Sequence, residues 1–138
     1  MQSYKNHTRY NPLHHFVLSP ITVIVFIIAI VAWFQGNGSF FDTLLAIGLV
    51  LVALVARLYA LSLQDRIIRL EMRQRYFELT GKRFNEIESE ITLKQIIALR
   101  FASDEELLPL IERVRLEKMA PKAIKQSIKN WVPDTKRV

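Results

Sequence analysis

The sequence of 138 residues contains no cysteine and only three histidines. The lack of cysteine excludes disulfides and metal sites with thiolate ligands. The histidines are His7, His14 and His15, all within the first 15 residues. A metal site would need them to converge with a fourth ligand, so polar side chains at a membrane surface are the simpler interpretation. We therefore predict neither a metal site nor a cofactor.

Sequence signatures of catalysis are also missing. No phosphate-binding loop, dinucleotide-binding loop or nucleophile elbow occurs. Glu86, Glu88 and Glu90 alternate in the polar stretch KRFNEIESEIT, residues 82–92, but no His or Asp lies beside them. A solvated linker or a short helical turn is the expected structure there. These absences predict that the protein is not an enzyme.

Apolar residues, in contrast, make up 51% of the chain and are concentrated in two blocks before Gln64. The first block, residues 16–34, contains no charged residue and is long enough to span a membrane. Pro20 suits the first position of a helix capped by Ser19, which would leave residues 16–18 as an extended lead. Trp33 and Phe34 suit the far interface of the membrane.

The second block begins the stretch on which the rest of the chain depends, residues 44–80. It is apolar at first and then amphipathic and charged, with no Pro or Gly after Gly48 until its end. A single helix over this range would measure roughly 55 Å, against about 30 Å for the hydrocarbon core. The short turn at residues 35–43, in which Ser39 and Asp42 resemble a capping box, makes the two spans an antiparallel hairpin.

One face of the long helix carries a repeat of apolar residues spaced three and four apart. Small residues dominate its membrane part and large ones the remainder, which favours close packing in lipid and burial in water respectively. The preferred partners are the chain's own first helix and its C-terminal domain; self-association and a different protein are the alternatives. Gln74 would either fix the register by a hydrogen bond or lie at a wet edge. The predicted packing seam is Ala46, Leu49, Ala53, Ala56, Ala60, Leu63, Ile67, Leu70, Gln74 and Phe77.

The distribution of basic residues predicts the topology. Of the 19 Lys and Arg residues, 17 lie at or after Arg57, and the other two are Lys5 and Arg9. The turn between the spans carries Asp42 but no basic residue. The positive-inside rule then places both termini in the cytoplasm.

Four arginines lie at or just beyond the inner end of the second span. For Arg57, snorkelling to the headgroups is preferred over a buried pair with a partner's carboxylate. The others would either contact anionic headgroups or form an ordinary solvated face with neighbouring acids. The predicted headgroup contacts on the long helix are Arg57, Arg66, Arg69 and Arg73.

The last 58 residues, 81–138, predict a small domain of three short helices that needs the long helix to complete its core. Thr92 opens the first of these helices, and Ser103 with Glu106 resembles a capping box for the second. Pro109 would kink this second helix or begin it. Pro121 opens the last helix, which is expected to continue to Pro133.

A row of lysines marks that last helix: Lys118, Lys122, Lys125 and Lys129. Three short helices ending in a basic one are weakly similar to a helix-turn-helix module, but the last helix offers only Gln126 and Asn130 for base readout. Nucleic acid is therefore an unfavoured partner. The row suits phosphate in general, in RNA, the ribosome or anionic lipid, and a solvated basic face is the simpler alternative.

Four stretches resemble a family of small bacterial membrane proteins described only as a domain of unknown function. They are YKNHTRYNPLHHF, RLYALSLQDRIIRLEMR, LRFASDEELLPL and KAIKQSIKNWVPDTKRV, which extend over nearly the whole chain. The resemblance implies a bacterial membrane protein with two spans and a cytoplasmic helical domain. With the topology above, it makes the bacterial inner membrane the expected location. It implies no activity, cofactor or site residue.

Together these observations predict an all-α protein made of a transmembrane helical hairpin, whose second helix extends into the cytoplasm, and a small three-helix cytoplasmic domain. Besides the bilayer, its expected partners are proteins of a membrane complex or further copies of itself. The predicted function is that of an accessory, assembly or scaffold subunit, or of a homo-oligomer; the alternative is a membrane-tethered binder of polyanions. The expected segments are 1–15 (cytoplasmic or interfacial), 16–34 (first span), 35–43 (external turn), 44–80 (second span and extension) and 81–138 (cytoplasmic domain).

Overall fold

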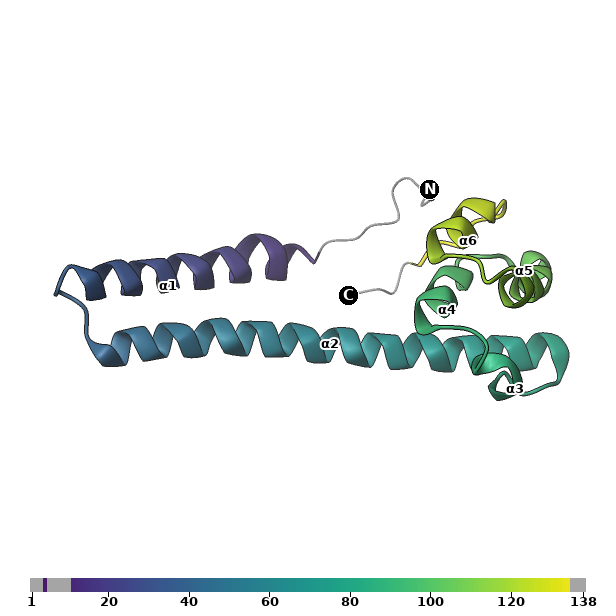
Figure 1. The fold of residues 1–138 in the computed structure, drawn as a ribbon, viewed down its shortest axis with the longest axis horizontal. Helices are drawn as coiled ribbons and strands as arrows, with labels where there is room; N and C mark the ends of the chain where they lie inside the picture. The colour runs from purple at the N-terminus through teal and green to yellow at the C-terminus, as the bar shows by residue number, and fades with distance from the viewer. Residues whose placement is uncertain (1–3, 5–10, 135–138) are drawn as a thin grey trace. The chain divides into compact units, whose positions relative to one another are not determined.

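The computed structural model describes Tyr4 and residues 11–134. Its regular elements are helices joined by turns and short extended segments (Figure 1), and an isolated β-bridge links Ala102 and Trp131. The chain divides into two compact units, centred on residues 11–62 and residues 63–134. Helix α2, Phe40–Thr80, contributes to both. The predicted all-α class is confirmed, and each unit is described by itself below.

The first unit begins with a π-helical turn, η1 (Leu13–Leu18), that continues into helix α1 (Ser19–Phe34). Ser19 donates its backbone N–H to the carbonyl of His14, five residues earlier. The prediction that residues 16–18 are extended and that Ser19 caps the helix was therefore wrong. Pro20 cannot donate a hydrogen bond and its ring crowds the preceding turn, and a wider π turn accommodates both effects.

Thr22 lies two residues after Pro20 and bonds back to the preceding turn. Its hydroxyl donates to the carbonyl oxygens of Leu18 and Ser19, both at 3.0 Å. Ser and Thr side chains in a helix commonly bond to carbonyls three or four residues earlier in this way. Thr22, the one buried residue of α1, thus has its polar group satisfied.

A tight turn joins α1 to α2, and α2 begins at Phe40, four residues earlier than predicted. The backbone N–H of Asp42 donates to the hydroxyl of Ser39 at 3.1 Å, and this hydroxyl donates to the Asp42 carboxylate at 2.8 Å. Ser39 thus caps the helix as predicted. Gly38 is required in the turn, because a Cβ there would lie 2.6 Å from the backbone nitrogen of Trp33.

The second unit packs four short helices against the later part of α2. They are α3 (Asn85–Glu88), α4 (Leu93–Leu99), α5 (Asp104–Glu117) and α6 (Pro121–Ser127). The sequence predicted the last three, and α3 is the short helical turn expected as one alternative for residues 82–92. The large side chains with almost no exposure are Met72, Phe84, Ile96, Leu99, Phe101, Leu107, Ile111, Val114 and Ile124.

Of these four helices only α4 has a side-chain cap at its start. Thr92 and Gln95 form a complete capping box at α4. Ser103 is the N-cap residue of α5, but its side chain makes no capping hydrogen bond. Glu106, its predicted partner, instead accepts the backbone N–H groups of Lys129 and Asn130 at 3.1–3.2 Å. Pro109 lies inside α5, which is one helix from Asp104 to Glu117.

Helix α6 is shorter than predicted, because the chain becomes extended at Ile128 (ψ 123°). From there the backbone returns to the α4–α5 connection, where Val132 donates its N–H to the carbonyl of Phe101 at 2.8 Å. The indole of Trp131 stacks on the ring of Phe101, with 4.5 Å between ring centroids. A tertiary contact therefore ends the helix before Pro133, the residue expected to end it.

Candidate interaction surface on helix α2

The later part of α2 carries two rows of apolar side chains, of which the C-terminal domain covers only one. Ile68 and Met72 are buried at 5% and 2% exposure, and Tyr76 packs against the same core. The second row remains open: Leu63, Ile67, Leu70 and Phe77 are 57%, 55%, 60% and 55% exposed. We call this second row, together with the exposed Gln74 that interrupts it, the α2 stripe.

The stripe is the inner half of the predicted packing seam. The preferred prediction, that this half packs on the chain's own C-terminal domain, was wrong. Both rows have helical spacing, so the apolar pattern alone predicts that each is buried but does not say by what. The two remaining interpretations, self-association and a different protein, are the ones that the open stripe allows.

Arginine side chains hold the domain on the covered face of α2. Arg75 donates to the Asp104 carboxylate at 2.6 Å and to the carbonyl oxygen of Ala102 at 2.7 Å. Arg73 donates to the Glu88 carboxylate at 2.7–2.8 Å, and Arg69 lies 3.3 Å from the same group. Since these bonds join α2 to the segments that follow it, they fix which face the domain occupies.

These contacts change the interpretation of two predicted headgroup ligands. Arg69 and Arg73 were expected to contact lipid or acids on their own helix, whereas both pair with Glu88 of α3. Arg66 is exposed, and Arg57 is half-buried. Neither Arg57 nor Arg66 has an ion pair within the described part of the chain, so their contact with headgroups stays a prediction.

A second ionic link holds the 82–92 segment to α5. Arg115 donates to the carboxylate of Glu90 at 2.9 and 3.1 Å and also pairs with Glu112 at 3.0 Å. The hydrogen bond from Arg115 lowers the pKa of Glu90 below its usual value, and Glu90 in turn raises the pKa of Arg115. The alternating glutamates of the sequence therefore include two structural partners of arginine, Glu88 and Glu90.

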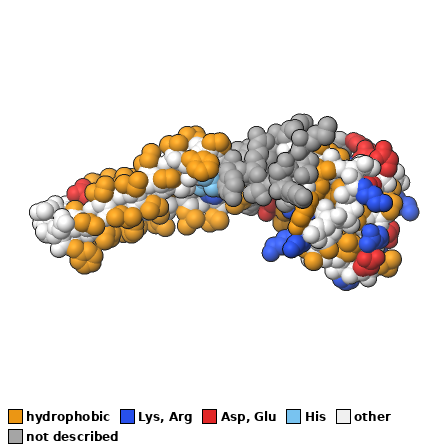
Figure 2. Space-filling view, turned by 90° about the horizontal axis from the view of Figure 1, so that it is seen from above, with side chains coloured by type: hydrophobic (Ala, Val, Ile, Leu, Met, Phe, Trp, Pro, Cys, Tyr) orange, Lys and Arg blue, Asp and Glu red, His pale blue; other side chains and the backbone are white. Residues whose placement is uncertain are grey.

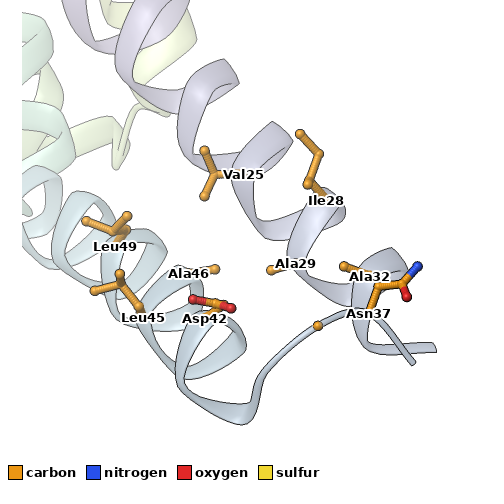
Figure 3. A pocket seen from close by; sticks show the side chains of 10 residues that line it. Val25, Ile28, Ala29, Ala32, Asn37, Asp42, Leu45, Ala46 and Leu49 are labelled. Carbon is orange, nitrogen blue, oxygen red and sulfur yellow. The ribbon is translucent and has the colours of Figure 1, made fainter. Parts of the chain in front are cut away.

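In the first unit the seam lies near helix α1. Ala46, only 2% exposed, faces α1, which runs antiparallel to α2 in this unit (Figures 1 and 3). A cavity of about 360 Å³ lies between the two helices, and Val25, Ala29 and Leu49 are among the residues that line it. The small side chains on both helices leave this space open. In the membrane part of the seam only Ala46 is buried, while Leu49, Ala56 and Ala60 are exposed. Packing of this part of the seam on the chain's own first helix therefore stays a prediction.

The surfaces of the two units differ in chemistry. Figure 2 shows hydrophobic side chains covering the first unit on the face in view, and acidic and basic side chains gathered on the second. The helices Leu13–Phe34 and Phe40–Thr80 are long and apolar enough to cross a membrane. Most of their apolar side chains are exposed, which is the pattern of a lipid-facing surface and not of a water-soluble core.

The four lysines of the predicted stripe do not share one helical face. Helix α6 contains only Lys122 and Lys125. Lys118 is the left-handed C-cap residue of α5 (φ 49°), and Lys129 follows the end of α6. The ammonium group of Lys125 lies 5.6 Å from the centroid of the Phe101 ring, so its charge is engaged in a cation–π contact.

The histidines that the structure describes take part in local contacts at the start of η1. The ring Nδ1 of His15 lies 2.9 Å from the carbonyl oxygen of Asn11, and the ring of His14 packs edge-on against that of His15. His7 lies outside the described residues. Within Tyr4 and residues 11–134, no three His, Asp or Glu side chains converge to hold a metal ion.

The sequence model of a family of unknown function, DUF6526, matches residues 1–138, the full length of the chain. Comparisons with curated proteins and with solved structures give no match.

Proposed function

The chain belongs to the DUF6526 family, whose function is unknown, and we propose that it is a non-enzymatic protein of the bacterial inner membrane. It acts as an accessory, assembly or scaffold subunit of a membrane complex, or as a homo-oligomer. Two helices anchor it, and the domain after α2 faces the cytoplasm. The part offered to a partner is the later half of α2.

The observation that carries this proposal is the open α2 stripe. Four large apolar side chains lie half-exposed in a row on a helix segment that also bears Arg66, Arg69 and Glu71. Such a charged segment belongs outside the hydrocarbon core, so lipid does not cover the row. Because contiguous exposed apolar surface of this kind commonly marks an interaction site, a protein partner is the occupant we propose.

Membrane anchoring is supported by length and composition. The second apolar helix has 41 residues, about 60 Å at 1.5 Å per residue, twice what a bilayer core requires. The surplus falls where the arginines begin, and basic residues are typical of the cytoplasmic side. We therefore propose that both termini are cytoplasmic and that the turn with Asp42 is external.

The topology has a direct test, because the chain contains no natural cysteine. Single cysteines at Asn37 in the turn and at Lys122 in α6 provide two exposed positions. In intact cells an impermeant thiol reagent should label only the cysteine at position 37, and both should react after the membrane is opened. Labelling of position 122 alone in intact cells would reverse the proposed orientation.

Polyanion binding through Lys118, Lys122, Lys125 and Lys129 is the less supported function. These lysines belong to three different segments, and Lys125 contacts an aromatic ring. A phosphate-tracking surface would be expected to present its charges together to solvent. If the protein does act in this way, changing the four lysines to alanine will abolish a salt-sensitive attachment to RNA or anionic vesicles.

The proposed function is tested by purifying the chain from its native membranes in a mild detergent and measuring the particle mass and its protein content. We expect an assembly larger than one chain. Leu70→Glu should break this assembly, because it places a charge in the stripe. Leu79→Glu, a change of the same type on another face of α2, should not. Particles of a single chain in the unaltered protein would refute the proposal.

A further inference from the structure

We propose that a second copy of this chain covers the α2 stripe, so that two α2 helices pair in parallel and in register. This inference rests on the proposed function, since it names the partner at the same surface. If Ile67 and Gln74 are assigned to position a of a heptad, then Leu63, Leu70 and Phe77 occupy position d. The buried Met72 then falls at position f, directly opposite the seam. A second helix can therefore dock without displacing the domain.

The side chains of the stripe suit pairing with an identical helix. A β-branched residue at a with leucine at d favours two parallel strands, and Ile67 lies between Leu63 and Leu70 in this order. A single polar residue at an a position specifies the register of such a pair, and Gln74 provides it. In the present structure the Gln74 amide donates to the Glu78 carboxylate at 2.8 Å. In the proposed pair this bond within one helix is exchanged for one between the two Gln74 side chains.

The charges beside the stripe are complementary only in the parallel arrangement. Arg66 and Arg73 occupy position g, while Glu71 and Glu78 occupy position e. In a parallel pair each g residue meets the e residue that follows five positions later on the other helix. This places Arg66 against Glu71 and Arg73 against Glu78 of the second copy. An antiparallel pair would instead place arginine against arginine and glutamate against glutamate.

Membrane anchoring favours the same direction, since two copies inserted with one topology have parallel helices. Arg66 and Glu71 are the informative pair. Both are exposed, and neither is bonded within the described part of the chain. Arg73 already binds Glu88, so its pairing with Glu78 of a second copy would compete with a contact inside the chain.

Cysteine crosslinking tests the arrangement, because in a parallel pair in register each d residue faces its own copy. Leu63→Cys, Leu70→Cys and Phe77→Cys are introduced one at a time into the full chain, and isolated native membranes are treated with a mild oxidant. All three should give covalent dimers, and the matched control Leu79→Cys should give several-fold less. An antiparallel pair centred on Leu70 would crosslink at Leu70→Cys alone, which overturns the inference, as does crosslinking at none of the three.

A charge exchange separates pairing between copies from a structural effect inside one chain. Glu71→Arg should reduce the crosslinked fraction of Leu70→Cys about tenfold under limiting oxidation, and the double change Arg66→Glu with Glu71→Arg should restore it. Residues 66 and 71 are five apart and do not face each other on one helix, so rescue requires two copies. Glu105→Arg, at an exposed position of α5, should leave the crosslinked fraction unchanged. Failure of the double change to restore the crosslink would contradict the proposed pairing.

The crosslinks and the particle mass distinguish the two proposals. An assembly that contains other proteins in fixed ratio, without crosslinks at Leu63→Cys, Leu70→Cys and Phe77→Cys, refutes the second copy and leaves the proposed function standing. Single-chain particles without these crosslinks refute both.

Discussion

Arg75 is the residue whose replacement tests best how the domain is held on α2. Its guanidinium group donates to the Asp104 carboxylate and to the carbonyl oxygens of Ala102 and Arg100, at 2.6, 2.7 and 3.4 Å. Methionine has a stem of similar length but no donor. Arg75→Met should therefore remove all three bonds while keeping most of the packing.

The cost of this change can be built from its parts. Ala102 is fully buried (0% exposed), so its carbonyl loses a partner at about 1–3 kcal/mol. The Asp104 side chain is 61% exposed, so this ion pair adds only about 0–1 kcal/mol. The 3.4 Å bond adds little. The free energy of unfolding should fall by roughly 1–4 kcal/mol in total.

Arg75→Lys provides a graded comparison. Lysine keeps the charge but lacks the planar fork that reaches two acceptors at once, so we expect an intermediate loss. Arg113→Met is the matched control, because Arg113 only pairs with Glu117 one turn later on the exposed face of α5. Its loss should stay within about 0.5 kcal/mol.

The measurement is urea unfolding of the full chain in a mild detergent, followed by tryptophan fluorescence. The sequence has two tryptophans, so a Trp33→Phe background leaves Trp131, which stacks on Phe101, as the reporter. The midpoint should fall by roughly 0.5–2 M urea in Arg75→Met at an unchanged slope. A midpoint equal to that of Arg113→Met would refute the reasoning that this arginine holds the domain.

Three further predictions use the same measurement. Glu90→Gln should destabilise the C-terminal domain at neutral pH. Because Arg115 lowers the folded-state pKa of Glu90, the stability that Glu90 contributes is present above its unfolded-state pKa of about 4.3. The difference in stability between Glu90→Gln and the unaltered protein should vanish as the pH falls through the folded-state pKa. Gly81→Ala should cost about 1 kcal/mol, because position 81 has φ +69° and a side chain is strained there. Gly48→Ala, inside α2 with open space around it, should cost nothing. Equal effects of the two changes would contradict this account. Ile124→Ala, at a fully buried position, should cost about 2–5 kcal/mol, and a loss below 1 kcal/mol would show that α6 is not part of the cooperative core.

Local patterns in the sequence predicted most of the helices. The uncharged run before Phe34 and the long stretch ending at Thr80 are strong signals, because they depend only on composition and on the absence of breakers. Ser39, Thr92 and Pro121 likewise mark helix starts that the structure confirms. In each of these cases the determining residues lie within a few positions of one another.

The predictions failed where a distant segment decides the local structure. Helix α6 ends at Ser127 and not before Pro133, because the following backbone bonds to Glu106 and to Phe101. The π turn before α1 is a local effect of Pro20 and is a separate kind of failure. No rule based on helical spacing within one segment contains the contacts that end α6.

The same reasoning explains why the partner of the α2 stripe could not be chosen from the sequence. Two apolar rows on one helix provide similar reasons for burial, so the domain's choice between them depends on polar contacts. The row with Ile68 and Met72 is flanked by arginines whose partners, Glu88 and Asp104, lie 15 and 29 positions further along the chain. The stripe is flanked by Arg66 and Glu71, which have no such partner among the described residues but match each other across two copies. Apolar side chains thus favour the burial of both rows, whereas we propose that the charges beside each row specify what binds there.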